Sequence, residues 1–165
     1  MKQWNKEKVN SMKILVIYDS KTGNTQKMAE AIADGAKEAG AEVSVKKIGE
    51  PFPLTLLADY DGVAFGSPTR YADITNEMKD FLQHVEAYVK LGKMKMKGRK
   101  AAVFGSYGYD GAWVMEERLK GYVEALGYKI SIKACVKVDY EIKTRQKESL
   151  ADCNAWGKDF AKSIQ

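Results

Sequence analysis

The sequence is poor in histidine, proline and cysteine, and it contains no long apolar run. Its one histidine, His84, cannot supply a histidine-rich metal site or most histidine-based triads, and we expect it on an amphipathic helix. With only 3 prolines and 45% hydrophobic residues, the chain is neither collagen-like nor mucin-like nor disordered. Its apolar runs, such as residues 14–17, fall far short of the ~20 residues of a membrane span. No apolar segment follows the charged N-terminus, so we expect no secretory signal, no membrane contact and a cytoplasmic protein.

The two cysteines, Cys135 and Cys153, lie too far apart in the sequence for a CxxC pair or a zinc knuckle. In a reducing compartment, isolated cysteines behave as small apolar side chains. We therefore expect both to be buried free thiols.

Positive charge is in excess, with 27 Lys and Arg against 22 Asp and Glu, which gives a net charge of +5. Such an excess suits either nucleic acid or an acidic protein partner. A local concentration occurs at Lys90, Lys93, Lys95, Lys97, Arg99 and Lys100. No zinc finger, RNP-like aromatic motif or basic-zipper heptad accompanies these residues, so we predict a solvated face and no nucleic-acid partner.

Short apolar runs alternate with helical periods along a single domain of 165 residues. Residues 1–11 read as a polar leader, and residues 12–165 as one folded domain. We predict strands at residues 14–18, 43–45, 62–66, 101–104 and 130–138. We predict helices at residues 24–39, 54–58, 74–89, 115–126 and 150–164, with Gly40 and Gly127 ending the first and fourth of them. This alternation predicts an α/β fold with a doubly wound parallel sheet, whose ligands bind outside the carboxyl ends of the strands.

The loop after the first strand, residues 19–25, runs directly into a helix. Free backbone N–H groups and the helix dipole favour an anion there, and hydroxyl and amide side chains surround a glycine. The plainer interpretation is an ordinary N-cap, which needs only one such residue. Neither a P-loop nor a GxGxxG fingerprint is present. The loop therefore predicts a site for a monophosphate ester held by neutral donors.

The residues of this loop, Ser20, Lys21, Thr22, Gly23, Asn24 and Thr25, resemble the flavodoxin signature, in which the loop grips the phosphate of FMN. The resemblance extends from Met12 over nearly the whole chain, and its length matches the short-chain group. It implies a flavodoxin-like three-layer α/β/α sandwich, with a five-stranded parallel sheet in the order 2-1-3-4-5. The implied cofactor is FMN, bound without a covalent link.

Two further loops follow the third and fourth strands and are rich in aromatic residues. A flavin ring needs aromatic faces from flanking loops and backbone groups along its edge. Tyr71, Tyr107, Tyr109 and Trp113 are candidate faces, although aromatics in such loops also commonly plug the loop against the core. The predicted contacts are Ser67, Pro68, Thr69, Arg70 and Tyr71 in one loop and Ser106, Tyr107, Gly108, Tyr109, Asp110 and Gly111 in the other.

These two loops resemble different relatives. Residues 105–111 are similar to the flavodoxin module of diiron flavoproteins. The stretch from Leu57 to Leu82 instead resembles FMN-dependent NAD(P)H:quinone oxidoreductases related to tryptophan-repressor-binding protein. We expect a low-potential electron carrier between redox partners, with an NAD(P)H:quinone oxidoreductase as the alternative. A signalling receiver domain is excluded, since Ser67 and Pro68 stand where its phosphoacceptor aspartate belongs.

Two departures from ordinary flavodoxins bear on partners and on redox tuning. Many flavodoxins are acidic, whereas this chain is basic, so its partners are expected to be acidic. The resemblance implies a reductase or ferredoxin-type donor and an acceptor enzyme, and we expect a monomer or a weak dimer. Residues 69–71 contain no glycine, so a left-handed backbone there is expected to be costly. We expect Arg70 near the polar edge of the ring, where it favours the anionic reduced form.

Overall fold

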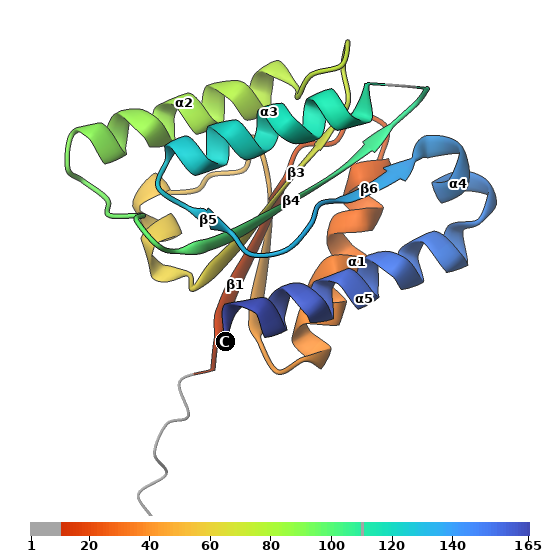
Figure 1. Cartoon of the computed structure of the whole chain (residues 1–165), viewed down its shortest axis with the longest axis horizontal. Helices are drawn as coiled ribbons and strands as arrows, with labels where there is room; N and C mark the ends of the chain where they lie inside the picture. The colour runs from red at the N-terminus through yellow and green to blue at the C-terminus, as the bar shows by residue number, and fades with distance from the viewer. Residues whose placement is uncertain (1–10, 110) are drawn as a thin grey trace, which may run out of the picture.

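The computed structural model describes residues 11–109 and 111–165 (Figure 1). The predicted leader, apart from Ser11, and the predicted site residue Asp110 lie outside the described residues. The predictions made for them stay predictions.

A parallel sheet forms the centre of the domain. Its strands are β1 (Lys13–Tyr18), β2 (Glu42–Lys47), β3 (Gly62–Pro68), β4 (Lys100–Tyr107), β5 (Lys129–Ile130) and β6 (Cys135–Val138). The order is β2-β1-β3-β4-β5, and β6 also pairs with β4. This confirms the predicted 2-1-3-4-5 order. The direction in which strands are added reverses at β1, so the loops that follow β1 and β3 open side by side at the carboxyl edge.

The fifth strand is not continuous over residues 130–138 as predicted. Ala101 of β4 pairs with Ile130, and Phe104 of β4 pairs with Cys135. Two residues of β4 therefore face the four residues 131–134, so the chain bulges away from the sheet between β5 and β6. The sequence of this stretch carries no proline or glycine to mark the interruption.

Helices cover both faces of the sheet, as Figure 1 shows. They are α1 (Asn24–Glu38), the 3₁₀ helix η1 (Leu54–Asp59), α2 (Asn76–Lys90), α3 (Ala112–Ala125), α4 (Asp139–Thr144) and α5 (Gln146–Ile164). α1 and α5 lie on one face, and α2 and α3 lie on the other (Figure 1). The predicted three-layer sandwich is confirmed, whereas the short helix α4 was not predicted.

Alternation along the strands builds two cores, one on each face of the sheet. In β1, Ile14 and Val16 point toward α1 and α5, while Leu15 and Ile17 point toward α2 and α3. All four side chains are buried. A strand buried on both faces reads as a continuous apolar run, which is why residues 14–17 predicted this strand correctly.

Candidate functional site

Three loops meet at the carboxyl edge of the sheet, and hydrogen bonds join them. The Asp19 N–H donates to the Gly66 carbonyl over 3.0 Å, which ties the loop after β1 to β3. The Thr69 N–H donates to the Ser106 carbonyl over 2.8 Å, which ties the loop after β3 to β4. The Thr25 and Ser106 hydroxyls are 2.9 Å apart and both are buried. The structure thus brings the three predicted loops together, with every predicted site residue except Asp110 among the residues that it describes.

The N-terminus of α1 is left open by the protein's own side chains. Gly23 precedes the helix with φ 92°, a left-handed conformation that glycine adopts without steric cost. No side chain caps α1 in the described part of the chain, and no acidic residue stands in its first turn. Ser20 folds inward instead, and its hydroxyl accepts from the Gly23 N–H at 3.1 Å. An uncapped helix start bordered by hydroxyls is suited to an anion.

Asn24 is held in place by a residue that sequence reasoning missed. Its side-chain amide donates to Asp139 Oδ1 over 3.0 Å, and Asn24 itself is buried. Asp139 is the first residue of α4 and lies 115 positions further along the chain. No local pattern could have linked the two residues, because their contact depends on the path of the chain after β6.

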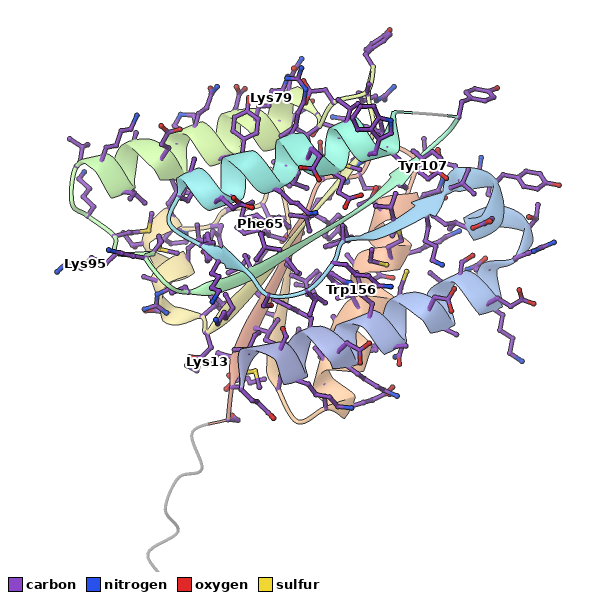
Figure 2. The ribbon with its side chains drawn as sticks, viewed as in Figure 1. Lys13, Phe65, Lys79, Lys95, Tyr107 and Trp156 are labelled. Carbon is purple, nitrogen blue, oxygen red and sulfur yellow. The ribbon has the colours of Figure 1, made fainter. Side chains whose placement is uncertain are left out.

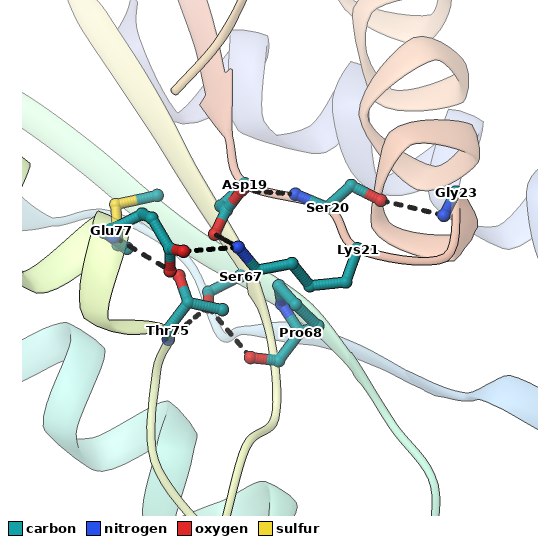
Figure 3. A network of polar contacts seen from close by, with 9 residues as sticks. Asp19, Ser20, Lys21, Gly23, Ser67, Pro68, Thr75 and Glu77 are labelled. Carbon is teal, nitrogen blue, oxygen red and sulfur yellow. Dashed lines mark hydrogen bonds and ion pairs between the residues drawn. The ribbon is translucent and has the colours of Figure 1, made fainter. Parts of the chain in front are cut away.

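Lys21 turns toward α2 and neutralises acidic groups (Figure 3). Its ammonium donates to Glu77 Oε1 at 2.6 Å and lies 3.7 Å from Asp19 Oδ2. This hydrogen bond lowers the pKa of Glu77 and raises that of Lys21. The contact fastens the loop after β1 to the first turn of α2.

The loop after β3 closes in a tight turn without glycine. The Arg70 N–H donates to the Asp73 carbonyl over 2.8 Å, and the Asp73 N–H returns a 2.9 Å bond. Between them, Tyr71 and Ala72 have φ of 50° and 59°. We expected a left-handed backbone to be costly at residues 69–71, yet Tyr71 adopts it, and so does Ala72 just beyond that stretch. The mutual Arg70–Asp73 bonds hold the strained residues in place.

Asp73 anchors this turn to both neighbouring helices. Its Oδ1 accepts from the Ile74 N–H at 2.7 Å, and its Oδ2 lies 2.5 Å from the Lys79 ammonium of α2. The same oxygen is 3.8 Å from the guanidinium of Arg118 in α3. Asp73 is a second functional candidate that the sequence did not reveal, since it lies beyond the last predicted contact, Tyr71.

Tyrosines project from the two aromatic loops rather than plugging them against the core. Tyr71 and Tyr109 are 103% and 98% exposed, and Trp113 is 72% exposed. Tyr107, at the carboxyl end of β4, is half-buried (Figure 2). The interpretation that these aromatic side chains pack their loops against the core is therefore wrong for Tyr71, Tyr109 and Trp113. A Cβ atom at Gly111 would come within 2.7 Å of the Ala72 Cβ, so the two loops lie close together at these residues.

A cavity of about 350 Å³ opens between the 70–73 turn and α2. Lys21, Arg70, Tyr71, Asp73, Glu77 and Lys79 are among the residues that line it. Nearby, the buried Thr69 hydroxyl oxygen has no hydrogen-bond partner among the described residues. Hydroxyls, free helix N–H groups and exposed aromatic faces thus lie at one edge, and this donor set suits a ligand with an anionic tail and a flat apolar head.

A comparison with protein families identifies the chain. The family model described as Flavodoxin matches residues 16–156. The chain belongs to the flavodoxin family. The proteins of this family bind FMN, which agrees with the donor set at the carboxyl edge of the sheet.

The proteins similar to this chain include quinone dehydrogenases and solved flavodoxins. The "NAD(P)H dehydrogenase (quinone)" of Archaeoglobus fulgidus is 36% identical over 118 residues, which cover 57% of this chain and 61% of that protein. The chain thus spans less than two thirds of that relative. A solved flavodoxin from the domain Archaea is 26% identical with a TM-score of 0.77, covering 93% of this chain and 99% of that one. Oxidised Flavodoxin 1 of Bacillus cereus is 27% identical with a TM-score of 0.75, covering 91% and 97%.

Other features noted in the sequence lie away from this edge. His84 is exposed on α2, and its Nδ1 lies 2.6 Å from the Asp80 carbonyl. Lys95, in the lysine-rich segment, and Tyr107 lie at opposite ends of the molecule (Figure 2). The described residues contain no group of three or more metal-ligating side chains. Within the same residues, no helix is both long and apolar enough to cross a bilayer.

Proposed function

We propose that this protein is an electron carrier that holds FMN at the carboxyl edge of its sheet. The observation that carries the proposal is the open N-terminus of α1, which faces the same edge as the exposed Tyr71 and Tyr109. Bound FMN supplies one- or two-electron redox chemistry, and the protein contributes binding, stacking and electrostatic tuning.

The phosphate of FMN is assigned to the loop after β1. The first N–H groups of α1 and the hydroxyls of Ser20, Thr22 and Thr25 are the donors, and Asn24 is fixed beside them by Asp139. The ammonium of Lys21 is engaged by Glu77. The phosphate is therefore held chiefly by neutral donors and the helix dipole, which are effective ligands for a dianion at a helix start.

The ring is assigned to the space beside Tyr71 and Tyr109. Aromatic side chains stack on flat apolar ligands, and both tyrosines have their full faces available. Backbone groups of residues 67–70, 106–109 and Gly111 border this space, and they are among the contacts proposed from the sequence. Arg70, which forms no ion pair among the described residues, favours negative charge on the ring when its side chain turns toward the ring's polar edge.

A titration of the flavin-free protein with FMN tests the phosphate assignment. Thr22 is exposed, so Thr22→Val removes a hydroxyl without opening the core. A lost hydrogen bond to a charged group weakens binding about 10-fold or more. Thr55→Val is the matched control, because Thr55 is also exposed but lies on η1 at the other edge of the sheet, and this variant should bind FMN like the wild type. Equal affinities in all three proteins would contradict the assignment.

An NAD(P)H:quinone oxidoreductase is the second candidate. It is supported by the names of the relatives and by the cavity next to Arg70, which leaves open space beside the proposed ring position. Anaerobic mixing with NADH or NADPH separates the two candidates. A carrier keeps its yellow colour until a partner reductase is added, whereas direct bleaching by the nicotinamide favours the enzyme.

The partner of the carrier is proposed to dock over the exposed tyrosines and Trp113. The lysine-rich segment begins at the far end of α2, a helix of 15 residues or about 22 Å. Its charge is more than two Debye lengths from the proposed ring at physiological salt. The lysine-rich segment therefore adds little to docking at the aromatic edge, where the exposed Arg70 is the charge that an acidic partner meets. Partner reduction is expected to slow with added salt, and insensitivity to salt would contradict docking on an acidic partner.

A further inference from the structure

The two cysteines are brought together under the sheet, on the face that α1 and α5 cover. Cys135 is the first residue of β6, and Cys153 lies in α5. Their sulfur atoms are 3.8 Å apart, although 18 positions separate them in the sequence. The side chains are 7% and 0% exposed, in a core cluster that includes Phe104 and Trp156. The pair is thus a dithiol that the sequence did not reveal.

We propose that Cys135 and Cys153 form a reversible dithiol–disulfide pair, a redox site separate from the flavin site. The sulfur atoms of a disulfide are about 2.05 Å apart, so these two need to approach by about 1.8 Å. They already lie in contact across the β6–α5 packing, with no other side chain between them to be displaced. These cysteines are the only two in the sequence, so a disulfide within one chain can have only this connectivity.

The surroundings assign different roles to the two thiols. Cys135 is the more accessible, and the cationic Lys137 lies two residues further along β6. The hydrogen bond from the Cys153 thiol and the nearby lysines lower the pKa of Cys135, in spite of its burial. The same contact raises the pKa of Cys153. Because the thiolate is the nucleophile, Cys135 reacts first with an oxidant and Cys153 resolves the product.

A hydroperoxide is a sufficient oxidant for this reaction. The Cys135 thiolate attacks one oxygen of hydrogen peroxide, which forms an S–O bond, breaks the O–O bond and releases hydroxide. The Cys153 sulfur then attacks the sulfur of the Cys135 sulfenic acid and displaces its hydroxyl. Each hydroxide takes up one thiol proton. In total, two thiols lose two electrons and two protons, and one peroxide becomes two water molecules.

The disulfide would fasten a segment that supports the loop after β1. The chain between the two cysteines contains α4, whose Asp139 accepts the hydrogen bond from Asn24. The Lys137–Asp152 ion pair, at 2.7 Å, already joins β6 to α5 beside the thiols. A covalent link at this point restricts the unfolded chain, so oxidation is expected to raise Tm by about 5 °C or more.

Thiol alkylation followed by mass spectrometry of the full chain tests the proposal. Wild-type protein is treated with hydrogen peroxide, unfolded, and alkylated with iodoacetamide. We expect loss of both alkylation sites, a peptide that joins Cys135 to Cys153, and recovery of both sites after dithiothreitol. The wild-type experiment decides the proposal alone, since it needs no substitution that could unfold the chain. Persistence of both free thiols, or a cross-link between two chains, would overturn it.

Single variants test the order of the reaction. Cys153→Ser should accumulate sulfenic acid at Cys135, which dimedone traps, because the resolving thiol is gone. Cys135→Ser should leave Cys153 alkylatable at the same dose of peroxide, and Cys135→Ala and Cys153→Ala are the second variants if a buried serine prevents folding. Trapping at Cys153 in place of Cys135 would contradict the assigned roles. A fall in the Tm of the oxidised wild type would show that the disulfide distorts the core. It would contradict the claim that the two thiols are already positioned to form the bond.

Discussion

The helices α1 and α2 begin at the same edge of one sheet, and the protein treats their N-termini in opposite ways. At α2, the Thr75 hydroxyl accepts from the Met78 N–H at 3.2 Å, and the Ser67 hydroxyl accepts from the Thr75 N–H at 3.1 Å. At α1, none of the described side chains caps the helix, and the Ser20 hydroxyl accepts from the Gly23 N–H just before it. A helix start closed by its own side chains serves stability, whereas an open one keeps its donors for a ligand.

The largest effect on stability is expected at the closed helix start. Thr75→Val keeps the shape of the side chain but leaves the N–H of Met78 without its partner in a buried environment. Loss of an N-cap of this kind lowers the free energy of unfolding by about 1–2 kcal/mol. Urea unfolding measures the loss, and FMN affinity should change little. A variant as stable as the wild type that binds FMN poorly would reverse the roles assigned to the two helices.

A smaller loss of stability is expected where α1 begins. Apart from its two chain neighbours, no atom of the described residues lies within 4 Å of a Cβ added at Gly23, so the cost of Gly23→Ala is backbone strain at φ 92°, about 1 kcal/mol. Gly121→Ala is the matched control, because Gly121 also has free space around it but lies inside α3. That change should raise stability by about 0.5–1 kcal/mol. In chemical denaturation, the free energy of unfolding should therefore fall in Gly23→Ala and rise in Gly121→Ala. A change of the same sign in both variants would contradict the account of Gly23.

The 70–73 turn offers the reverse substitution. Ala72 occupies the left-handed region at φ 59° without being glycine, so Ala72→Gly removes strain. The greater freedom of glycine in the unfolded chain offsets part of this gain, which leaves an increase of about 0.5 kcal/mol. Thermal unfolding of the variant beside the wild type measures it. A clear decrease in Tm would show that the contact of Ala72 with Gly111 outweighs the strain.

The smallest effect concerns the Lys21–Glu77 ion pair. The pKa of Glu77 is lowered by the hydrogen bond from Lys21, so the stabilisation is fully present above pH 4.5 and is lost as the pH falls through the lowered value. Both groups are exposed, so the effect is slight. Between pH 6 and pH 3, urea midpoints of the wild type should fall slightly more than those of Glu77→Gln. Parallel pH profiles would mean that the pair contributes nothing.

Most of the fold could be predicted from the sequence because each buried strand carries its own signal. The apolar run at 14–17 and the periodic helix from Ile74 to Val89 both correspond to observed elements. The break between β5 and β6 could not be predicted, since it arises from a mismatch in pairing with β4 and not from a breaking residue. The helix α4 was not predicted, because six residues are too few to show a helical period.

The candidate site also combines features that are local in the sequence with contacts between distant elements. The hydroxyls and glycine of the loop after β1 are local in sequence, so their place at the start of α1 could be predicted, whereas their role as a ligand cradle stays a prediction. The support from Asp139, Asp73 and Glu77 depends on contacts between distant elements. The left-handed backbone of Tyr71 and Ala72 was not predicted, because neither residue type favours that conformation. The mutual hydrogen bonds between Arg70 and Asp73 impose it.

The most direct test of the open α1 terminus is the affinity of the flavin-free wild type for FMN relative to riboflavin, which has the same ring but no phosphate. Quenching of flavin fluorescence during titration gives both dissociation constants under the same conditions. Several charge-assisted hydrogen bonds to the phosphate predict that FMN binds about 100-fold more tightly or better. Equal affinity for the two flavins would mean that the α1 terminus does not bind the phosphate, and the central claim would be wrong.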